Sequence, residues 1–519
     1  MSAARRRLRL LTKKIKLRGE YDFDKVAGEV LRSLKVENAA GFDELEIFNE
    51  IISRRVITHL KVTSCGNEYF FKKSSVAREE ERFGAEVNRL VKKNLYRLLV
   101  ANFALDEVPY GIMHGVRPTK IIQRWLSEGY GVTSQGVIDR DRITRRICSD
   151  FLTERGKAQL LTEVAIRQLP IIKSGAGKIG VYVGIPFCKT RCLYCSFPSQ
   201  ALPADKVIAE FMTALNRDMA AATEAINRYG LKVQTIYVGG GTPTALPENF
   251  FAEMLAAVYE NFYGADVEEF TVECGRPDTI SAEKISVMKK FSVTRVSVNP
   301  QTMHQRTLDI IGRKHTVADV ERAFKELRAA GSWRINMDLI IGLPGERLAD
   351  FKATLEKILE LAPDDVTIHS LAIKRGSKMQ MRLADELNRL EDFNLPDDEE
   401  VRAMADYAGE VLRGENFYPY YLYRQGYMSG QIENVGWCKH GAEGIYNVQI
   451  MGERQTILGV GAAASTKIPD TWRIRTAFNA KDLKTYIKDL ERYIAKREAV
   501  MAQVYGGVKN GIRDARRDD

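Results

Sequence analysis

Three cysteines lie within eight positions of the chain, at Cys188, Cys192 and Cys195. Thiolates at this spacing on one short loop can each bind a different iron of a [4Fe–4S] cluster, which leaves the fourth iron without a protein ligand. A structural zinc site needs a fourth Cys or His nearby, and apart from the triplet neither type occurs between Cys148 and Cys274. A disulfide accounts for only two of the three thiols. The spacing therefore predicts an iron–sulfur cluster.

A run of glycines, from Gly239 to Gly241, directly precedes Thr242. Consecutive glycines let backbone N–H and C=O groups approach a ligand where a Cβ would collide with it. A tight turn between a strand and a helix would use the same residues, so the run alone leaves both interpretations open.

Several polar side chains lie inside or beside apolar runs that we expect to be strands. Glu273 ends one run, Gln301 follows the next, and Asp338 lies within another. Buried polar groups need partners, and a bound ligand is one possible partner. Helix N-caps and satisfied core carboxylates are the alternatives. Tyr182 also lies within an apolar run, where a ligand contact and a core aromatic residue are both consistent with its position.

The elements that must position these residues alternate between short β-rich runs and helical patterns. The predicted strands are Ile179–Gly184, Thr235–Gly239, Glu269–Glu273, Val293–Val298, Ile335–Ile341 and Val366–Ser370. This alternation predicts parallel strands joined by right-handed crossovers, in an α/β partial (βα)6 barrel. A flat doubly wound sheet is the alternative. The cysteines and polar residues follow the strands, at the rim where barrels of this kind carry their chemistry.

The flanking regions have other patterns. Residues 21–174 predict an α+β N-terminal domain, with helices at Asp22–Val36 and Ala77–Leu105 and a hairpin of Val56–Val62 with Tyr69–Lys73. The alternation stops after about residue 380. The predicted domains are therefore a basic tail over 1–20, the N-terminal domain over 21–174, the barrel over 175–380 and a C-terminal domain over 381–519 that covers the barrel.

Composition excludes several classes of protein. The chain has 519 residues, of which 45% are hydrophobic and 28% charged, so it is neither disordered nor a small disulfide scaffold. It has no long uncharged apolar run, so we expect no transmembrane segment. Seven sparse cysteines predict a reducing compartment, the cytoplasm.

The net charge of +10 is concentrated at one end of the chain. The first twenty residues contain eight basic residues and one acidic residue, so they carry seven of the ten positive charges. This segment has no apolar core of the kind that a signal peptide needs. The remaining residues carry only three net positive charges, so we expect no nucleic-acid partner.

The triplet, with an aromatic residue before its last cysteine, resembles the signature of the radical S-adenosylmethionine (SAM) enzymes. The motifs Tyr182–Cys188, Gly239–Thr244, Asp338–Gly345 and Gly459–Ala462 together resemble the oxygen-independent coproporphyrinogen III oxidase family. The long region ahead of the barrel is similar to that of the family's HemZ-type coproporphyrinogen dehydrogenases. Relatives often carry His two residues after the tyrosine of the first motif, whereas Gly184 stands here.

The resemblance implies a [4Fe–4S] cluster on Cys188, Cys192 and Cys195, with SAM on the open iron. One electron from the reduced cluster would break a sulfonium C–S bond, and the resulting 5′-deoxyadenosyl radical would remove hydrogen from the substrate. Tyr182 would lie near both cluster and SAM. The implied SAM-contacting residues are Tyr182, Gly240, Gly241, Thr242, Glu273, Gln301, Arg313 and Asp338. Arg313 would suit the carboxylate of SAM, and Asp338 its ribose hydroxyls.

The implied reaction converts two propionates of coproporphyrinogen III to vinyl groups and gives protoporphyrinogen IX. An electron donor such as flavodoxin or ferredoxin would be a partner. The alternatives are haem methylation or other haem processing by the same machinery, a non-catalytic haem chaperone, and an RNA-modifying enzyme. Lys374, Arg375, Lys378 and Arg424 are candidates to bind the substrate carboxylates, or they form a solvated basic surface.

Overall fold

The computed structural model describes residues 15–19, 24–34, 36, 44–64, 66–78, 83–103, 105–374, 377, 379, 394–426, 428–470 and 473–506. These residues form two compact units. The first lies within Met1–Glu163, and the second lies within Val164–Met381 and Leu390–Asp519. The predicted domain boundaries remain predictions.

The first unit is a four-stranded sheet with helices, as the predicted α+β pattern requires. Its strands are β1 (Ile15–Gly19), β2 (Glu44–Ile52), β3 (Arg55–Ser64) and β4 (Asn67–Val76), in the order β1-β2-β3-β4. β1 pairs in parallel with β2, and the other neighbours are antiparallel. The predicted hairpin is β3 and β4. Strand β1 falls inside the segment expected to be a basic tail, and residues 1–14 lie outside the described part.

Helices α2 (Asp24–Ser33) and α3 (Phe83–Phe103) of the first unit bury apolar side chains against this sheet. The unit also contains α4 (Thr119–Ser127) and α5 (Arg140–Phe151), and α6 (Arg155–Ser174) spans the boundary in sequence. Val30 of α2 and Leu95 of α3 share one core with Leu45 and Leu60 of the strands. This burial of a helical stripe is what the predicted helices require.

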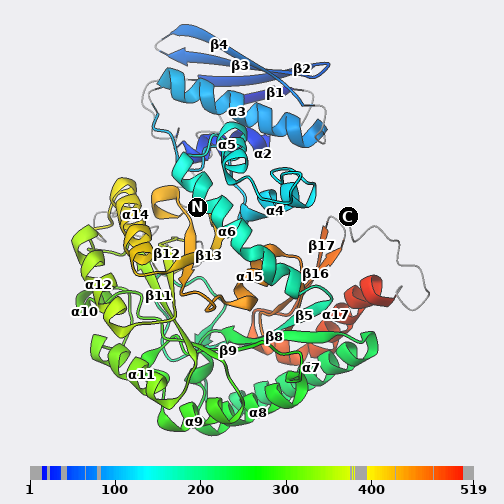
Figure 1. The fold of residues 1–519 in the computed structure, drawn as a ribbon, viewed down its shortest axis with the longest axis vertical. Helices are drawn as coiled ribbons and strands as arrows, with labels where there is room; N and C mark the ends of the chain where they lie inside the picture. The colour runs from blue at the N-terminus through cyan, green and yellow to red at the C-terminus, as the bar shows by residue number, and fades with distance from the viewer. Residues whose placement is uncertain are drawn as a thin grey trace. The chain divides into compact units, whose positions relative to one another are not determined.

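The second unit contains the predicted barrel strands in their predicted order (Figure 1). They are β5 (Lys178–Ile185), β8 (Lys232–Gly240), β9 (Glu269–Glu273), β10 (Arg295–Ser297), β11 (Arg334–Ile341) and β12 (Asp365–Ser370). Neighbouring strands of this set pair in parallel. The parallel α/β barrel is therefore confirmed.

The C-terminal region adds strands to both edges of the same sheet. β13 (Tyr418–Tyr423) and β14 (Asn434–Cys438) extend it antiparallel beyond β12. At the other edge β15 (Thr456–Gly461) pairs in parallel with β5, followed by the antiparallel strands β16 (Ser465–Asp470) and β17 (Arg473–Phe478). β15 is a seventh parallel strand beside the six predicted ones in the described sheet.

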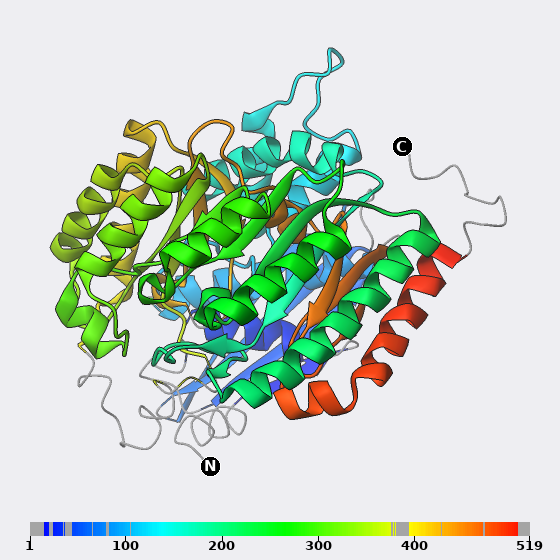
Figure 2. The same cartoon turned by 90° about the horizontal axis from the view of Figure 1, so that it is seen from below.

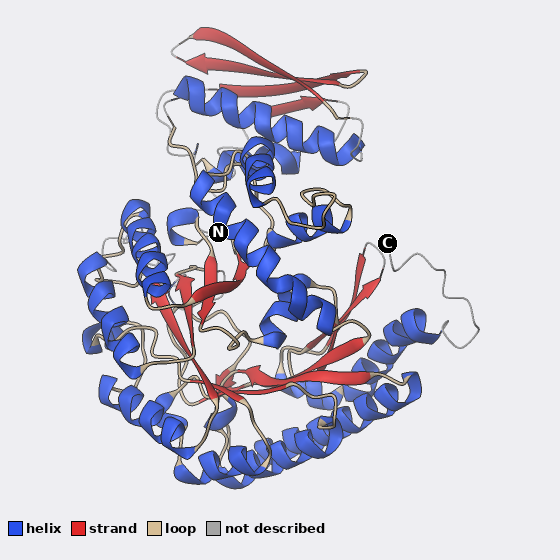
Figure 3. Cartoon of the chain, in the orientation of Figure 1, coloured by secondary structure: helices blue, strands red, loops and turns tan. Residues whose placement is uncertain are grey.

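Amphipathic helices cover the outer face of this curved sheet (Figure 3), and in Figure 2 the green helices cross that face. The connecting helices are α7 (Asp205–Tyr229), α8 (Glu248–Phe262), α9 (Ala282–Lys290), α10 (Gln305–Ile310), α11 (Val317–Ala330) and α12 (Leu348–Leu361). The later helices are α14 (Asp398–Gly414), α15 (Ile445–Gly452), α16 (Leu483–Lys488) and α17 (Leu490–Tyr505). None of the described helices is long and apolar enough to cross a membrane.

Local sequence explains where these helices begin and end. α11 begins with a capping box in which Thr316 and Asp319 satisfy each other's backbone N–H groups. α7 is followed by the C-cap residue Gly230, whose φ of 62° is left-handed and suits glycine. The helices thereby return the chain to the same end of the sheet, and each strand's carboxyl end reaches one common rim.

Candidate active site

The cysteine loop leaves the rim directly after β5. A short parallel pair, β6 (Phe187–Cys188) with β7 (Gln200–Ala201), closes its base. Cys188 and Cys192 are buried, Cys195 is partly buried, and all three are free thiols. Within the described part of the chain, no three Cys, His, Asp or Glu side chains converge on a position for one metal ion. Thiols that each bind a separate iron do not need to converge on one point.

Cys192 has the most electropositive surroundings of the three thiols. Burial alone raises the pKa of Cys192, but the guanidinium groups of Arg313 and Arg276 outweigh it and hold that pKa below its usual value. Arg276 Nη2 donates to Cys192 Sγ at 3.0 Å. By contrast, burial raises the pKa of Cys195. Because the thiolate is the form that binds metal, the positive groups favour cluster binding at Cys192.

Backbone carbonyls from two rim loops hold Arg313. Its Nη2 donates to Gly275 O at 2.6 Å and to Asn299 O at 2.7 Å. Its Nη1 lies 3.4 Å from the hydroxyl of Tyr194, which itself contacts Cys192. Arg313 is thus fixed beside the cysteine loop, and its contact with the SAM carboxylate remains a prediction.

The glycine run lies against the start of the cysteine loop. Gly241 N donates to Ile185 O at 2.7 Å, and Thr242 N donates to Phe187 O at 2.6 Å. A Cβ on Gly241 would lie 2.3 Å from Phe187 O, so only glycine fits there. Thr242 Oγ1 lies 3.6 Å from Cys188 Sγ. The glycine run therefore lets the backbone that follows β8 lie close against the backbone at the start of the cysteine loop.

Glu273 lies at the end of β9 and faces the glycine run. Its carboxylate accepts hydrogen bonds from Tyr237 OH at 2.5 Å and from Gly240 N at 3.3 Å. Burial, with the negative charge of Asp338 nearby, raises the pKa of Glu273 to about 7. At neutral pH this carboxyl can therefore hold or release a proton.

A stack of tyrosines lies beside Glu273, which Tyr237 of the stack contacts. The rings of Tyr182 and Tyr237 are 6.1 Å apart, and those of Tyr237 and Tyr446 are 4.3 Å apart. Tyr182 and Tyr237 are register partners on β5 and β8, so their side chains share one face of the sheet. Tyr182 thus packs within the stack, and its predicted contact with SAM remains a prediction.

Gln301 and Asp338 are brought together through the backbone. Gln301 N donates to Asp338 O at 3.0 Å, and Gln301 O accepts from Ile340 N at 2.9 Å. Gln301 has a φ of 72°, a left-handed conformation that costs energy for a residue other than glycine and is often found at functional sites. Burial acts to raise the pKa of Asp338, but its interaction with His369 outweighs burial and lowers that pKa.

The rim offers polar atoms that fit an absent polar cofactor. Gln301 Oε1, Asn299 Oδ1 and Arg313 Nε are buried and have no hydrogen-bond partner among the described residues. Buried polar atoms in native proteins are almost always paired, because leaving them unpaired is costly. Together with the three thiols, these atoms form a donor and acceptor set that suits a [4Fe–4S] cluster with a charged, hydroxylated ligand beside it.

The remaining predicted residues have mixed positions. Lys374 is partly buried, and burial lowers its pKa. Arg424 donates to Gln431 O at 3.3 Å, whereas Arg375 and Lys378 lie outside the described residues. Cys274 is fully buried against Met288, as expected for a small core residue.

Gly184 differs from the family pattern for a steric reason. A Cβ on Gly184 would lie 2.6 Å from Ala462 O, and a Cβ on Gly461 would lie 2.4 Å from Gly184 O. The two strands β5 and β15 therefore approach closely at this pair, and no larger residue fits at Gly184.

Four residues of this rim escaped prediction from the sequence. They are Tyr237 beside Glu273, Arg276 beside Cys192, His369 beside Asp338, and Tyr423 beside His369. Tyr237 had a usable signal, because it is polar within the apolar run before the glycines. Arg276 had no comparable signal, because its contact depends on the approach of two separate loops.

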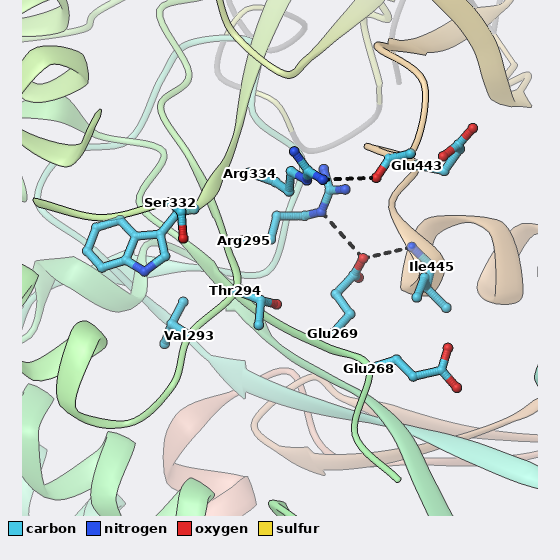
Figure 4. Close-up of a pocket in the computed structure, with 11 residues that line it drawn as sticks. Glu268, Glu269, Val293, Thr294, Arg295, Ser332, Arg334, Glu443 and Ile445 are labelled. Atoms are coloured by element: carbon cyan, nitrogen blue, oxygen red, sulfur yellow. Dashed lines mark hydrogen bonds and ion pairs between the residues drawn. The ribbon is translucent and has the colours of Figure 1, made fainter. Parts of the chain in front are cut away.

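A separate pocket of about 590 Å³ lies at the opposite end of the strands (Figure 4). Its lining includes Glu269, Arg295 and Arg334, which are the first residues of β9, β10 and β11. Arg295 is paired there with Glu269 and with the buried Asp365. The pocket therefore lies at the amino ends of the strands and is distinct from the candidate site, which lies at their carboxyl ends.

Comparisons with known proteins agree with this rim chemistry. A family model described as the radical SAM superfamily matches residues 182–358. The oxygen-independent coproporphyrinogen-III oxidase-like protein HemZ of Bacillus subtilis is 35% identical over 438 residues, 82% of this chain and 83% of the relative. The heme chaperone HemW of Lactococcus lactis is 30% identical over 284 residues, 55% of this chain and 68% of the relative.

Among solved structures, coproporphyrinogen III oxidase (HemN) from Escherichia coli, described as a radical SAM enzyme, has a similar fold. The TM-score is 0.50 with 20% sequence identity, and the match covers 62% of this chain and 72% of that one. At this identity the likeness shows the fold.

Proposed function

Because the chain belongs to the radical SAM proteins of the oxygen-independent coproporphyrinogen III oxidase family, we propose that it decarboxylates coproporphyrinogen III without oxygen. Each of two propionates would lose CO2 and become a vinyl group, and the product would be protoporphyrinogen IX. SAM would take the hydrogen atom and end as 5′-deoxyadenosine and methionine, and a one-electron acceptor such as the oxidised cluster would take the remaining electron. The observation that carries the proposal is the match to HemZ over most of both chains. Radical SAM proteins use a [4Fe–4S] cluster and SAM, and the rim described above supplies groups for both.

The chain's own residues would bind and orient these groups. Cys188, Cys192 and Cys195 would hold the cluster, which with SAM supplies a carbon radical that removes hydrogen from the substrate. Glu273, positioned by Tyr237, would accept hydrogen bonds from the SAM amino group together with the backbone of the glycine run.

The other rim groups would hold the remaining parts of SAM. Arg313 would pair with its carboxylate. Asp338, held by Asn336 and His369, would accept from the ribose hydroxyls. Tyr182 and Gln301 complete the proposed set. Buried apolar strands around them would exclude water from the reacting centre.

An anaerobic assay tests the proposal directly. The cluster is reconstituted in the full chain, and coproporphyrinogen III, SAM and dithionite are added. We expect release of CO2, formation of 5′-deoxyadenosine and accumulation of protoporphyrinogen IX. Absence of both CO2 and protoporphyrinogen IX, with the cluster intact, would overturn the proposal. The matched controls are the Cys192→Ala variant, which should be inactive, and Cys274→Ala, which should remain active.

A second candidate function is haem carriage. The match to HemW proteins, which are named heme chaperones, favours it. Tight, stoichiometric haem binding by a protein that forms no protoporphyrinogen IX in the same assay would support the chaperone. Product formation without stable haem binding would support the oxidase.

We further propose a cytoplasmic location and an electron donor such as flavodoxin or ferredoxin. The six cysteines in the described part of the chain are all free thiols, which supports a reducing compartment. A one-electron reductant is required by the proposed chemistry, and the reaction has no need of a nucleic-acid partner.

A further inference from the structure

Arg276 makes a direct contact with a predicted cluster ligand. Its Nη2 donates to Cys192 Sγ at 3.0 Å and to Thr190 O at 2.9 Å. Arg276 is only 6% exposed, so water weakens neither interaction. One guanidinium nitrogen thus contacts both the backbone of the cysteine loop and one of its sulfurs.

The surrounding structure fixes Arg276 in this position. It directly precedes a short 3-10 turn at Pro277–Thr279. Its carbonyl oxygen accepts from Thr279 N at 2.9 Å and from Thr279 Oγ1 at 2.7 Å. Lys284 holds this 3-10 turn, because its ammonium group donates to Thr279 O at 3.2 Å. The backbone that carries the guanidinium is therefore fixed, and the bond to Thr190 O holds the guanidinium itself beside Cys192.

The three thiols differ in this respect. In the described structure Cys188 Sγ lies 3.6 Å from a neutral hydroxyl, that of Thr242. The Cys195 thiol has a neutral partner in the backbone of Phe197. Arg313, the other buried guanidinium nearby, directs its Nη2 to backbone carbonyls. Cys192 is thus the thiol with a cationic hydrogen-bond donor.

We propose that Arg276 is a positioning residue that sets the reduction potential of the cluster through its hydrogen bond to Cys192. Hydrogen bonds to ligand sulfurs and nearby positive charge stabilise the reduced cluster, because reduction adds one negative charge. With Arg276 in place, the cluster would accept one electron from a reductant such as dithionite at a higher potential. The inference rests on the cluster of the proposed function and not on its porphyrinogen substrate.

The potential itself is the test. The full chain is reconstituted anaerobically and titrated with dithionite, and the electron paramagnetic resonance signal of the reduced cluster is followed. We expect Arg276→Met to lower the equilibrium constant for reduction by about tenfold or more, which is about 59 mV for one electron. Arg276→Lys, which keeps the charge without the fixed planar donor, should give a smaller shift.

The matched control is Lys189→Met. This variant removes one positive charge from the same loop, where Lys189 is 57% exposed and pairs with Asp278 at 3.0 Å instead of a sulfur. We expect its shift to be well below that of Arg276→Met, because water screens an exposed charge. Equal shifts in the two variants, or an unchanged potential in Arg276→Met, would overturn the proposal.

A second measurement applies even if the variants fail to hold a cluster. Pulsed electron paramagnetic resonance of the wild-type protein, labelled with ¹⁵N-arginine, should show a ¹⁵N coupling to the reduced cluster. Absence of this coupling would overturn the proposed hydrogen bond. A failed decarboxylation assay with the coupling and the potential shift present would contradict the proposed substrate and leave the role of Arg276 intact.

Discussion

At the scale of single residues, the rim combines two acidic groups, two guanidinium groups and three thiols in a small buried region. These groups differ in their electrostatic environments. Cys192 lies near two positively charged guanidinium groups, whereas burial dominates the environments of Cys195 and Glu273. Such perturbed groups are typical of functional sites, because a site needs specific protonation states at neutral pH. Two predictions follow from individual side chains.

Cys192→Ala should abolish the iron–sulfur absorbance of the reconstituted protein. The remaining two thiols cannot hold the cluster through three irons. Iron content and visible absorbance measure the effect. Cys274→Ala removes a thiol that is buried against Met288, and it should retain the cluster. A brown Cys192→Ala protein with full iron content would refute the ligand assignment.

Glu273 should make stability of the SAM-free protein pH-dependent. Its pKa is raised from 4.5 to about 7 in the folded protein, so between these values the folded state holds a proton that the unfolded chain has lost. The stability that this group contributes is present below pH 4.5 and is lost as pH rises through about 7. The change is at most about 3 kcal/mol.

Glu273→Gln should remove this contribution. The free energy of unfolding of the variant, minus that of the wild type, should increase as pH rises through this window. Urea unfolding at a series of pH values measures the difference. Asp365, whose pKa burial also raises to about 7, titrates in both proteins and cancels. A difference that does not change with pH would contradict the prediction.

At the scale of elements, the site depends on glycines that let three strands and their loops approach closely. Gly241 lies against Phe187 at the start of the cysteine loop, and Gly184 lies against Gly461 where β5 meets β15. These contacts join loops that follow β5, β8 and β15, so the cysteine loop is shaped by its neighbours as well as by its own sequence.

Gly241→Ala should therefore weaken both the fold and the cluster. Its Cβ would collide with the backbone oxygen of Phe187 at 2.3 Å, and the strain should cost about 1–3 kcal/mol. Thermal unfolding and iron content after reconstitution measure the two effects. The control is Gly264→Ala, where a Cβ would meet nothing within 4 Å. If both variants behave like wild type, the close approach is unimportant.

The strands of the second unit differ in how far the sequence alone predicts them. The six barrel strands were predictable because each is a short apolar run followed by a helical pattern. β15 was not recognised as part of that sheet, because its partner β5 lies far earlier in the chain and periodicity carries no pairing information. β10 is shorter than predicted, Arg295–Ser297 within Val293–Val298.

The same distinction applies to the site. The cysteine triplet was predictable because its spacing alone specifies cluster chemistry. Arg276 and His369 were not, because each reaches its partner, Cys192 or Asp338, across loops or strands that meet only in the folded protein.

At the scale of the whole second unit, one buried aspartate connects the end of the chain to the barrel. Asp218 of α7 accepts from Arg497 Nη1 at 2.5 Å, Tyr486 OH at 2.9 Å, Asn479 Nδ2 at 3.0 Å and Gly461 N at 2.9 Å. Arg497 and Asp218 side chains are 3% and 1% exposed. This network joins α7, the last residue of β15, the residue after β17, α16 and α17.

Asp218→Asn should destabilise the unit by about 3–5 kcal/mol, because it leaves the buried Arg497 without its counter-charge. Urea unfolding measures the loss. The control, Glu491→Gln, breaks the neighbouring Arg217–Glu491 pair between the same two helices, whose side chains are 48% and 68% exposed. It should cost less than about 1 kcal/mol. Equal losses in the two variants would contradict the proposed role of the buried network.

The pairing of β15 with β5 also has a consequence for the order of events during synthesis. The strand that leads into the cysteine loop, Lys178–Ile185, emerges from the ribosome well before its edge partner Thr456–Gly461. Until then β5 has one unpaired edge, and Gly184 has no Gly461 beside it. The three cysteines are therefore synthesised long before their surroundings are complete, and we expect iron and sulfide to be delivered to the rim only after Thr456–Gly461 has paired with β5.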